Sequence, residues 1–355
     1  MQARPFGVYV HVPFCARRCD YCAFATWDDR PGLIGGYVDA VVREVGGAVA
    51  AGLPAATSAF FGGGTPSLLE PDQLGAIVAS LPLAPGAEVT VECNPDTVSV
   101  EKLARYRVAG VNRISLGVQS LDPDVLVALG RTHDPANVAV AVEAIADAGF
   151  EHWNMDLIYG TVGESLASWE STLAGAVALG PPHVSAYGLT VEAGTPLAGD
   201  PSRHPDDDDE ADKYVMAARV LEGAGLASYE VSNWARPGHE CRHNELYWSQ
   251  GDYRGFGCAA HSHEAGRRWW NVRTPERYMA LVAEGRSTTA ADEVLDREAQ
   301  RVEALQLALR TRTGVPDAAV PDDEELEHLV HRADGRATLT LEGRLLANEV
   351  AVRLR

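Results

Sequence analysis

Residues 9–22 read Tyr-Val-His-Val-Pro-Phe-Cys-Ala-Arg-Arg-Cys-Asp-Tyr-Cys, and this stretch decides the fold because a predicted strand runs directly into three clustered cysteines. The strand is residues 7–12, and Cys15, Cys19 and Cys22 follow it with C-x3-C-x2-C spacing. A loop this short can wrap three thiolates around one corner of a compact inorganic core. A [4Fe–4S] cube with full protein ligation uses four cysteines, so three would leave one iron open. A structural zinc site with a fourth ligand such as His11 is the alternative.

Short β-rich runs alternate with helical ones after this stretch. Repeated βα units indicate a parallel sheet covered by helices, which is the α/β class. Six units predict a partial (β/α)6 barrel of the TIM type, with its chemistry at the C-terminal ends of the strands. The predicted strands are residues 7–12, 58–61, 88–92, 113–117, 153–158 and 183–189, and the helices between them are 37–51, 73–80, 100–108, 136–148 and 166–179.

The chain changes character after these units. An acidic run, 206–210, precedes a predicted helix at 213–222, where it favours the positive end of the helix dipole. Residues 230–263 are rich in His, Asn, Trp, Tyr and Gly with little periodicity, which predicts one long functional loop. We expect a core barrel over 1–232 and a smaller, mainly helical region over 233–355. Within that region the predicted elements are helices at 275–284 and 296–310, then a short strand and a helix within 337–354.

The composition is that of a globular protein, with 46% hydrophobic and 23% charged residues among 355. The net charge of -20 disfavours nucleic acid and anionic lipid as partners. No apolar run approaches the roughly 20 residues that span a bilayer, and residues 1–6 do not resemble a secretory signal. We therefore expect a cytoplasmic protein, in whose reducing surroundings clustered cysteines bind metal, while Cys93, Cys241 and Cys258 stand alone in the sequence.

The YVHVPFC run and the cysteine triplet resemble the radical S-adenosylmethionine (SAM) superfamily, and within it the HemN/HemW group. The resemblance covers nearly the whole chain and implies a [4Fe–4S] cluster on Cys15, Cys19 and Cys22 whose open iron chelates SAM. Gly62-Gly63-Gly64-Thr65-Pro66 follows the second strand and resembles the loop that holds the SAM amino group. The cofactor-binding residues implied in this part are Tyr9, Tyr21, Gly63, Gly64, Thr65, Glu92, Gln119, Arg131 and Asp156. A buried polar network at the barrel mouth is the alternative for Asp156 and Arg131, and one or two SAM molecules stay open.

Two features separate the members of that group. The pattern C-x3-C-x2-C-x-C is typical of sequences that resemble the oxygen-independent coproporphyrinogen oxidases. In this chain Phe24 occupies the position of their additional cysteine. The later H-N-x-x-Y-W run resembles the HemW haem chaperones, in which imidazole is a suitable axial ligand and aromatic rings pack on the macrocycle. The resemblance implies haem contacts from His243, Asn244, Tyr247 and Trp248; Cys241, His261 and His263 are alternative ligands, and plain packing of the barrel is the other interpretation.

The expected function is a haem chaperone that binds haem, a [4Fe–4S] cluster and SAM and delivers haem to acceptor proteins. The alternative is a radical SAM enzyme, either like the coproporphyrinogen III oxidases or like the HemN-like methyltransferases, acting on a porphyrin or another aromatic substrate. We expect haem and haem-accepting proteins as partners, peripheral membrane contact through the acceptor, and no nucleic acid. Catalysis, the axial ligand and the oligomeric state stay open in the sequence.

Overall fold

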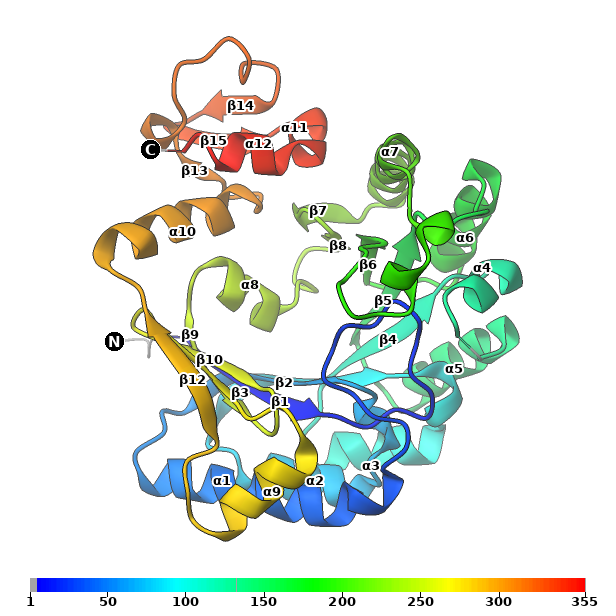
Figure 1. Cartoon of the computed structure of the whole chain (residues 1–355). Coiled ribbons are helices and arrows are strands. Elements are labelled where there is room, and N and C mark those ends of the chain that lie inside the picture. The colour runs from blue at the N-terminus through cyan, green and yellow to red at the C-terminus, as the bar shows by residue number, and fades with distance from the viewer. Residues whose placement is uncertain (1–4, 132, 355) are drawn as a thin grey trace.

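A computed structural model describes residues 5–131 and 133–354, and a single large sheet forms its centre (Figure 1). Within the described chain this sheet has the strand order β12-β11-β10-β9-β1-β2-β3-β4-β5-β6-β8-β7. The first six strands pair in parallel, and helices cover their outside, so the predicted α/β partial barrel is confirmed. These strands are β1 (Phe6–Val12), β2 (Ala56–Gly63), β3 (Leu83–Cys93), β4 (Arg113–Gln119), β5 (His152–Tyr159) and β6 (His183–Gly188).

The helices that follow the strands begin where the sequence offers a cap. In α3 (Val100–Val108), α5 (Pro135–Asp147), α6 (Leu166–Ala178) and α7 (Asp207–Gly223) the cap is a Ser or Asp whose side chain accepts a hydrogen bond from the first turn. The acidic run lies in the first turn of α7, so this helix starts earlier than predicted. The other covering helices are α1 (Ile34–Ala50), α2 (Pro71–Ser80) and the short α4 (Pro123–Ala128), which the sequence analysis missed.

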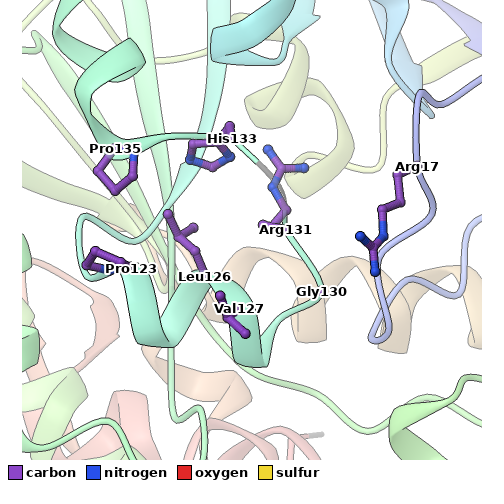
Figure 2. Close-up of a pocket in the computed structure, with 8 residues that line it drawn as sticks. All are labelled: Arg17, Pro123, Leu126, Val127, Gly130, Arg131, His133 and Pro135. Carbon is purple, nitrogen blue, oxygen red and sulfur yellow. The ribbon is translucent and has the colours of Figure 1, made fainter.

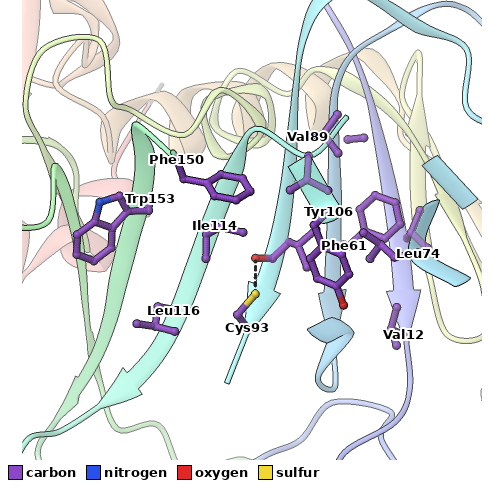
Figure 3. Packing of buried hydrophobic residues seen from close by; sticks show 14 of the residues in the cluster. Val12, Phe61, Leu74, Val89, Cys93, Tyr106, Ile114, Leu116, Phe150 and Trp153 are labelled. Atoms are coloured by element: carbon purple, nitrogen blue, oxygen red, sulfur yellow. Dashed lines mark hydrogen bonds between the residues drawn. The ribbon is translucent and has the colours of Figure 1, made fainter. Parts of the chain in front are cut away.

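The strands alternate between an apolar outer face and a more polar inner face. On β3, Val89, Val91 and Cys93 point outward into the core, whereas Glu88 and Glu92 lie on the other face. Figure 3 shows this outer layer, where Cys93 Sγ donates to the carbonyl of Val91 over 3.6 Å. Parallel strands covered on both faces are normally continuous apolar runs. The polar inner face therefore marks a lined interior that can bind a ligand.

Residues 230–263 do not form the single long loop that we predicted. They contain the end of β7 (Ala227–Glu230), all of β8 (Asn233–Ala235), α8 (Arg242–Trp248) and β9 (Asp252–Phe256), and part of β10 (His261–Glu264). Each element is three to seven residues long. Such lengths are too short for a helical or strand period to appear in the sequence. The prediction was wrong for this reason, and α8 lies on the inner side of the sheet (Figure 1).

The remaining chain extends the sheet and then forms a small unit with its own core. β11 (Arg267–Asn271), α9 (Pro275–Ala283) and β12 (Thr289–Val294) lead into α10 (Arg297–Leu309). A three-stranded sheet follows, and Leu309, Leu326 and Val350 pack at its centre. Division of the chain at residue 232 stays a prediction, since β8 to β12 belong to the main sheet. The elements of the last unit are β13 (Val315–Pro316), β14 (Val330–Ala333), β15 (Arg336–Leu339), α11 (Leu341–Leu345) and α12 (Ala347–Ala351).

No helix in the described ranges combines the length and the apolar character that crossing a bilayer requires.

Candidate functional site

The cysteine loop leaves β1 and crosses the C-terminal end of the barrel. Its two ends are tied together, because Cys15 N donates to Trp27 O over 3.0 Å and Trp27 N donates to Pro13 O over 2.8 Å. Inside the loop, the guanidinium of Arg18 donates to the carbonyl of Cys22 over 3.0 Å. The three thiols are half-buried and line one cavity. The loop thus brings all three cysteines to the lining of the same cavity.

The glycines at the end of β2 allow the loop to lie close. Gly64 N donates to Val12 O over 2.8 Å, and a Cβ on Gly64 would lie 2.5 Å from the carbonyl oxygen of Phe14. Gly63 has a φ of +107°, and a Cβ there would lie 2.4 Å from His11 Cε1. Only glycine fits these two positions without displacing the neighbouring chain. Gly63 and Gly64 are therefore required by the close approach of β1 and of the start of the cysteine loop.

His11 supports the loop from below. Its Nε2 donates to the carbonyl of Ala25 over 2.9 Å, and its Nδ1 accepts from the hydroxyl of Tyr9 over 3.1 Å. Burial lowers the pKa of His11 to about 4, against an opposing hydrogen bond to Ala25. The ring is therefore neutral near pH 7 and carries the single proton that the bond to Ala25 needs.

A cavity of about 640 Å³ lies between the cysteine loop and the inner face of the strands. This size is within the range of small-molecule sites. Besides the cysteines, the predicted residues that line it are Tyr21, Gly64, Thr65, Glu92, Gln119, Arg131, Asp156 and Asn244. The predicted residues outside its lining are Tyr9, Gly63, His243, Tyr247 and Trp248.

Two carboxyl groups face this cavity. Burial, followed by the nearby Asp156, raises the pKa of Glu92 to about 8, against an opposing hydrogen bond from Gly63 N at 3.2 Å. Burial also raises the pKa of Asp156, although Ser115 Oγ donates to it over 2.7 Å and Asn154 Nδ2 over 2.8 Å. Two acids in one low-dielectric site favour a cationic ligand, which lowers both pKa values when it binds.

The inner polar residues around Asp156 were missed by the sequence analysis. Asn154 Nδ2 donates to Ser115 Oγ and to Ser185 Oγ on the two adjacent strands, and all three residues line the cavity. A signal was present, because each residue is flanked on both sides by apolar residues within its strand. Such polar interruptions in parallel strands predict an interior site rather than a packed barrel core.

The cysteine thiols suit a metal cluster by their chemistry. Burial raises the pKa of Cys15 to about 11 and raises that of Cys22, so metal binding must displace their protons. Thiolates are the ligands of iron–sulfur clusters, and hydrogen bonds to sulfur tune such clusters. Arg131 Nη1 supplies one of these, to Cys19 Sγ over 3.8 Å. These residues fit a cluster. Across the described parts of the chain, no three His, Cys, Asp or Glu side chains gather closely enough for a single metal ion.

The predicted haem residues on α8 lie near the N-terminal ends of the strands. His243 is fully buried, with Nδ1 2.9 Å from Ser58 Oγ and Nε2 2.9 Å from the hydroxyl of Tyr247. Burial lowers the pKa of His243 to about 3. Both ring nitrogens are therefore occupied, and iron ligation would require the loss of one hydrogen bond. The assignment of His243, Asn244, Tyr247 and Trp248 to haem stays a prediction.

Comparisons with known proteins identify relatives of this chain over nearly its full length. The model of the radical SAM superfamily matches residues 9–174. The heme chaperone HemW of Mycobacterium tuberculosis is 43% identical over 372 residues, covering 99% of this chain and 95% of that protein. The heme chaperone HemW of Synechocystis is 37% identical, covering 95% and 84%. Coproporphyrinogen III oxidase (HemN) from Escherichia coli superposes with a TM-score of 0.85 over 98% of this chain and 89% of that one; its identity of 21% makes it evidence for the fold alone.

Proposed function

The chain belongs to the HemW family of the radical SAM superfamily, and from that premise we propose that it is a haem chaperone, which binds haem and passes it to haem-requiring acceptor proteins. The name of the relatives, heme chaperone HemW, supports this proposal over nearly the full length of the chain. The observation that carries it is the loop of Cys15, Cys19 and Cys22 above a lined cavity.

In this proposal the three thiolates hold a [4Fe–4S] cluster and leave one iron for SAM. When bound, the cluster supplies an electron and an open coordination site for SAM. Glu92 and Asp156 would face the positively charged part of SAM, whose charge would favour the ionised form of both acids against the burial that raises their pKa values. The backbone of Gly64 and Thr65 borders the cavity, and Gln119, Tyr21 and Arg131 complete its rim.

Phe24 separates this function from the oxidase alternative. Its side chain is 65% exposed on the cysteine loop. The pattern typical of those oxidases has an additional cysteine at this position. An exposed aromatic ring cannot replace a thiolate in redox or ligand chemistry. A methyltransferase would instead consume SAM on an aromatic substrate, so SAM turnover distinguishes that alternative.

We also propose a cytoplasmic location and a protein acceptor that the chain meets through its surface. The net charge of -20 supports a surface that avoids nucleic acid and anionic lipid. Any membrane contact then comes through the acceptor rather than through this chain.

The test is anaerobic reconstitution of the full chain followed by haem titration and transfer to haem-free myoglobin. We expect about four irons and four sulfides per chain. We expect haem to saturate near one per chain and then to move to the acceptor, whose Soret band reports the transfer. Cluster formation without haem binding, together with SAM consumption on porphyrinogens, would contradict the chaperone and favour the enzyme.

A further inference from the structure

A second pocket lies beside the cluster cavity (Figure 2). Its volume is about 380 Å³, at the small end of ligand sites. It shares Arg17, Gly130 and Arg131 with the larger cavity, so the two open side by side at the cluster end. One wall is apolar and the other carries nitrogen donors. The apolar wall is Pro123, Leu126, Val127 and Pro135, and the donors belong to Arg17, Arg131 and His133.

His133 is the unusual member of this pocket. Its side chain is 4% exposed, yet neither ring nitrogen makes a hydrogen bond of regular distance and angle within the described structure, and its interaction with the carbonyl of Val118 is a weak one. Burial first, and then the charge of Arg131, lower the pKa of His133 to about 4, although Asp96, the carbonyl of Val118 and Asp134 act in the opposite direction. The ring is thus neutral near pH 7 and offers one N–H. Buried polar atoms without partners are rare in folded proteins and point to a missing ligand or water.

Arg131 adds a second unused donor. Its Nη2 donates to Gly117 O over 2.8 Å and its Nη1 donates to Cys19 Sγ, but its buried Nε has no partner among the described residues. Arg17 is exposed on the cysteine loop. In the described chain no carboxylate lies within ion-pair distance of either arginine.

The nearby acids do not neutralise this pocket. Asp134 Oδ1 accepts from Ala136 N over 2.9 Å at the start of α5, and Asp96 Oδ1 accepts from Asn137 Nδ2 over 2.9 Å. Neither residue lines the pocket. The pocket therefore combines two arginines and one N–H donor, although the net charge of the whole chain is -20. Such a site suits an anion.

We propose that this pocket is the subsite for a propionate arm of haem, an assignment that rests on the proposed chaperone function. The carboxylate pairs with Arg17 and with Nε of Arg131 and accepts from His133, while the short hydrocarbon arm lies against Leu126 and Val127. The pocket takes one arm and leaves the macrocycle at the mouth of the cluster cavity. Phe24, exposed on the same loop, offers an aromatic face there.

The test compares haem with haem dimethyl ester, in which both propionates are esterified, on the reconstituted full chain. We expect Arg17→Gln to weaken haem binding about five- to tenfold, as for a lost charge-assisted pair, and to leave binding of the ester unchanged. Arg17 is exposed, so its replacement does not disturb folding. Arg273→Gln, another exposed arginine outside both pockets, is the matched control and should change neither affinity.

A second pair of variants tests the hydrogen bond from His133. His133→Gln keeps an N–H donor and should retain most of the haem affinity, whereas His133→Leu should lose about as much as Arg17→Gln. Equal binding of haem and its ester by the wild type, with no effect of Arg17→Gln, would overturn the propionate subsite and leave the chaperone standing. A wild-type chain that forms its cluster but binds neither porphyrin would overturn both.

Discussion

The two ends of the barrel contain histidines of the same kind in opposite surroundings. His243 near the N-terminal ends of the strands and His133 near the C-terminal ends are both buried, and burial lowers the pKa of each. Both nitrogens of His243 meet hydroxyl groups, while neither nitrogen of His133 makes a hydrogen bond of regular geometry among the described residues. Burial and a shifted pKa therefore do not separate a binding residue from a supporting one. The hydrogen bonds of the ring nitrogens separate the two kinds of residue, because a supporting histidine has both nitrogens paired.

On α8, His243 itself is held by a polar network, although its neighbours Cys241 and Asn244 line the cluster cavity. His243 N and Cys241 Sγ both donate to Glu88, and the ring of Phe60 stacks on His243 with centroids 5.4 Å apart. Gly7 lies so close that a Cβ there would sit 3.2 Å from His243 Cε1. The paired polar groups around His243 favour one arrangement of the chain. The cluster end, by contrast, brings thiols, acids and donors to the lining of one cavity.

Removal of a cluster thiol should give the largest effect and tests the open end directly. We expect Cys15→Ala, Cys19→Ala or Cys22→Ala to abolish the cluster, since two remaining thiolates cannot hold it. Iron, sulfide and the visible spectrum after anaerobic reconstitution measure the loss. Cys258→Ala removes a buried thiol that lies outside both pockets and should keep full iron content. A cluster that survives loss of any of the three would show that the ligands lie elsewhere.

Gly64→Ala should have the next largest effect. It tests the close contact between the end of β2 and the cysteine loop. A Cβ at this position would lie 2.5 Å from Phe14 O and 2.8 Å from Val12 O, so the backbone must move. We expect a loss of about 3 kcal/mol in the free energy of unfolding and a displaced loop that retains less iron. Urea denaturation and iron assays measure both effects.

The control for that variant is Gly47→Ala. Gly47 lies exposed in α1, and a Cβ added there would meet no atom within 4 Å, so alanine should be neutral or slightly stabilising. Equal behaviour of the two variants would contradict the close contact.

His243→Ala tests the closed end. We expect a loss of about 2 kcal/mol in the free energy of unfolding, because Ser58 and Tyr247 lose their shared partner inside the barrel. Tyr247→Phe removes one of these bonds and should cost less, while His331→Ala at an exposed position should cost nothing measurable. The Soret band of bound haem separates the two interpretations of His243, since an unchanged band together with the lost stability means plain packing. A shifted band without loss of stability would instead make His243 the ligand.

Much of the fold was predictable, because the strands and helices of the six βα units show the hydrophobic periodicity of their type. The cysteine loop follows the first strand, so its position at the C-terminal end of the barrel was predictable as well. Asp156 and Glu92 followed from the same placement together with the family resemblance. The short α4 and α8 were not predictable, because six or seven residues show too little periodicity. The donors of the second pocket were also beyond the sequence, because the lack of a regular hydrogen bond at His133 depends on tertiary contacts between α4, α5 and the cysteine loop.

Glu92→Gln should give the smallest effect and concerns the open end again. The folded protein raises the pKa of Glu92 from 4.5 to about 8, so between these values it binds a proton that the unfolded chain lacks. This contribution to stability is full below pH 4.5 and is lost as the pH rises through about 8. We expect the cluster-free wild type to lose about 1–2 kcal/mol more than Glu92→Gln between pH 6 and pH 8. Glu298→Gln, at an exposed position whose pKa is lowered, should follow the wild type. Identical pH profiles for the wild type and Glu92→Gln would mean that Glu92 is already ionised in the cluster-free protein. The carboxylate would then face the cavity in its charged form before any ligand binds.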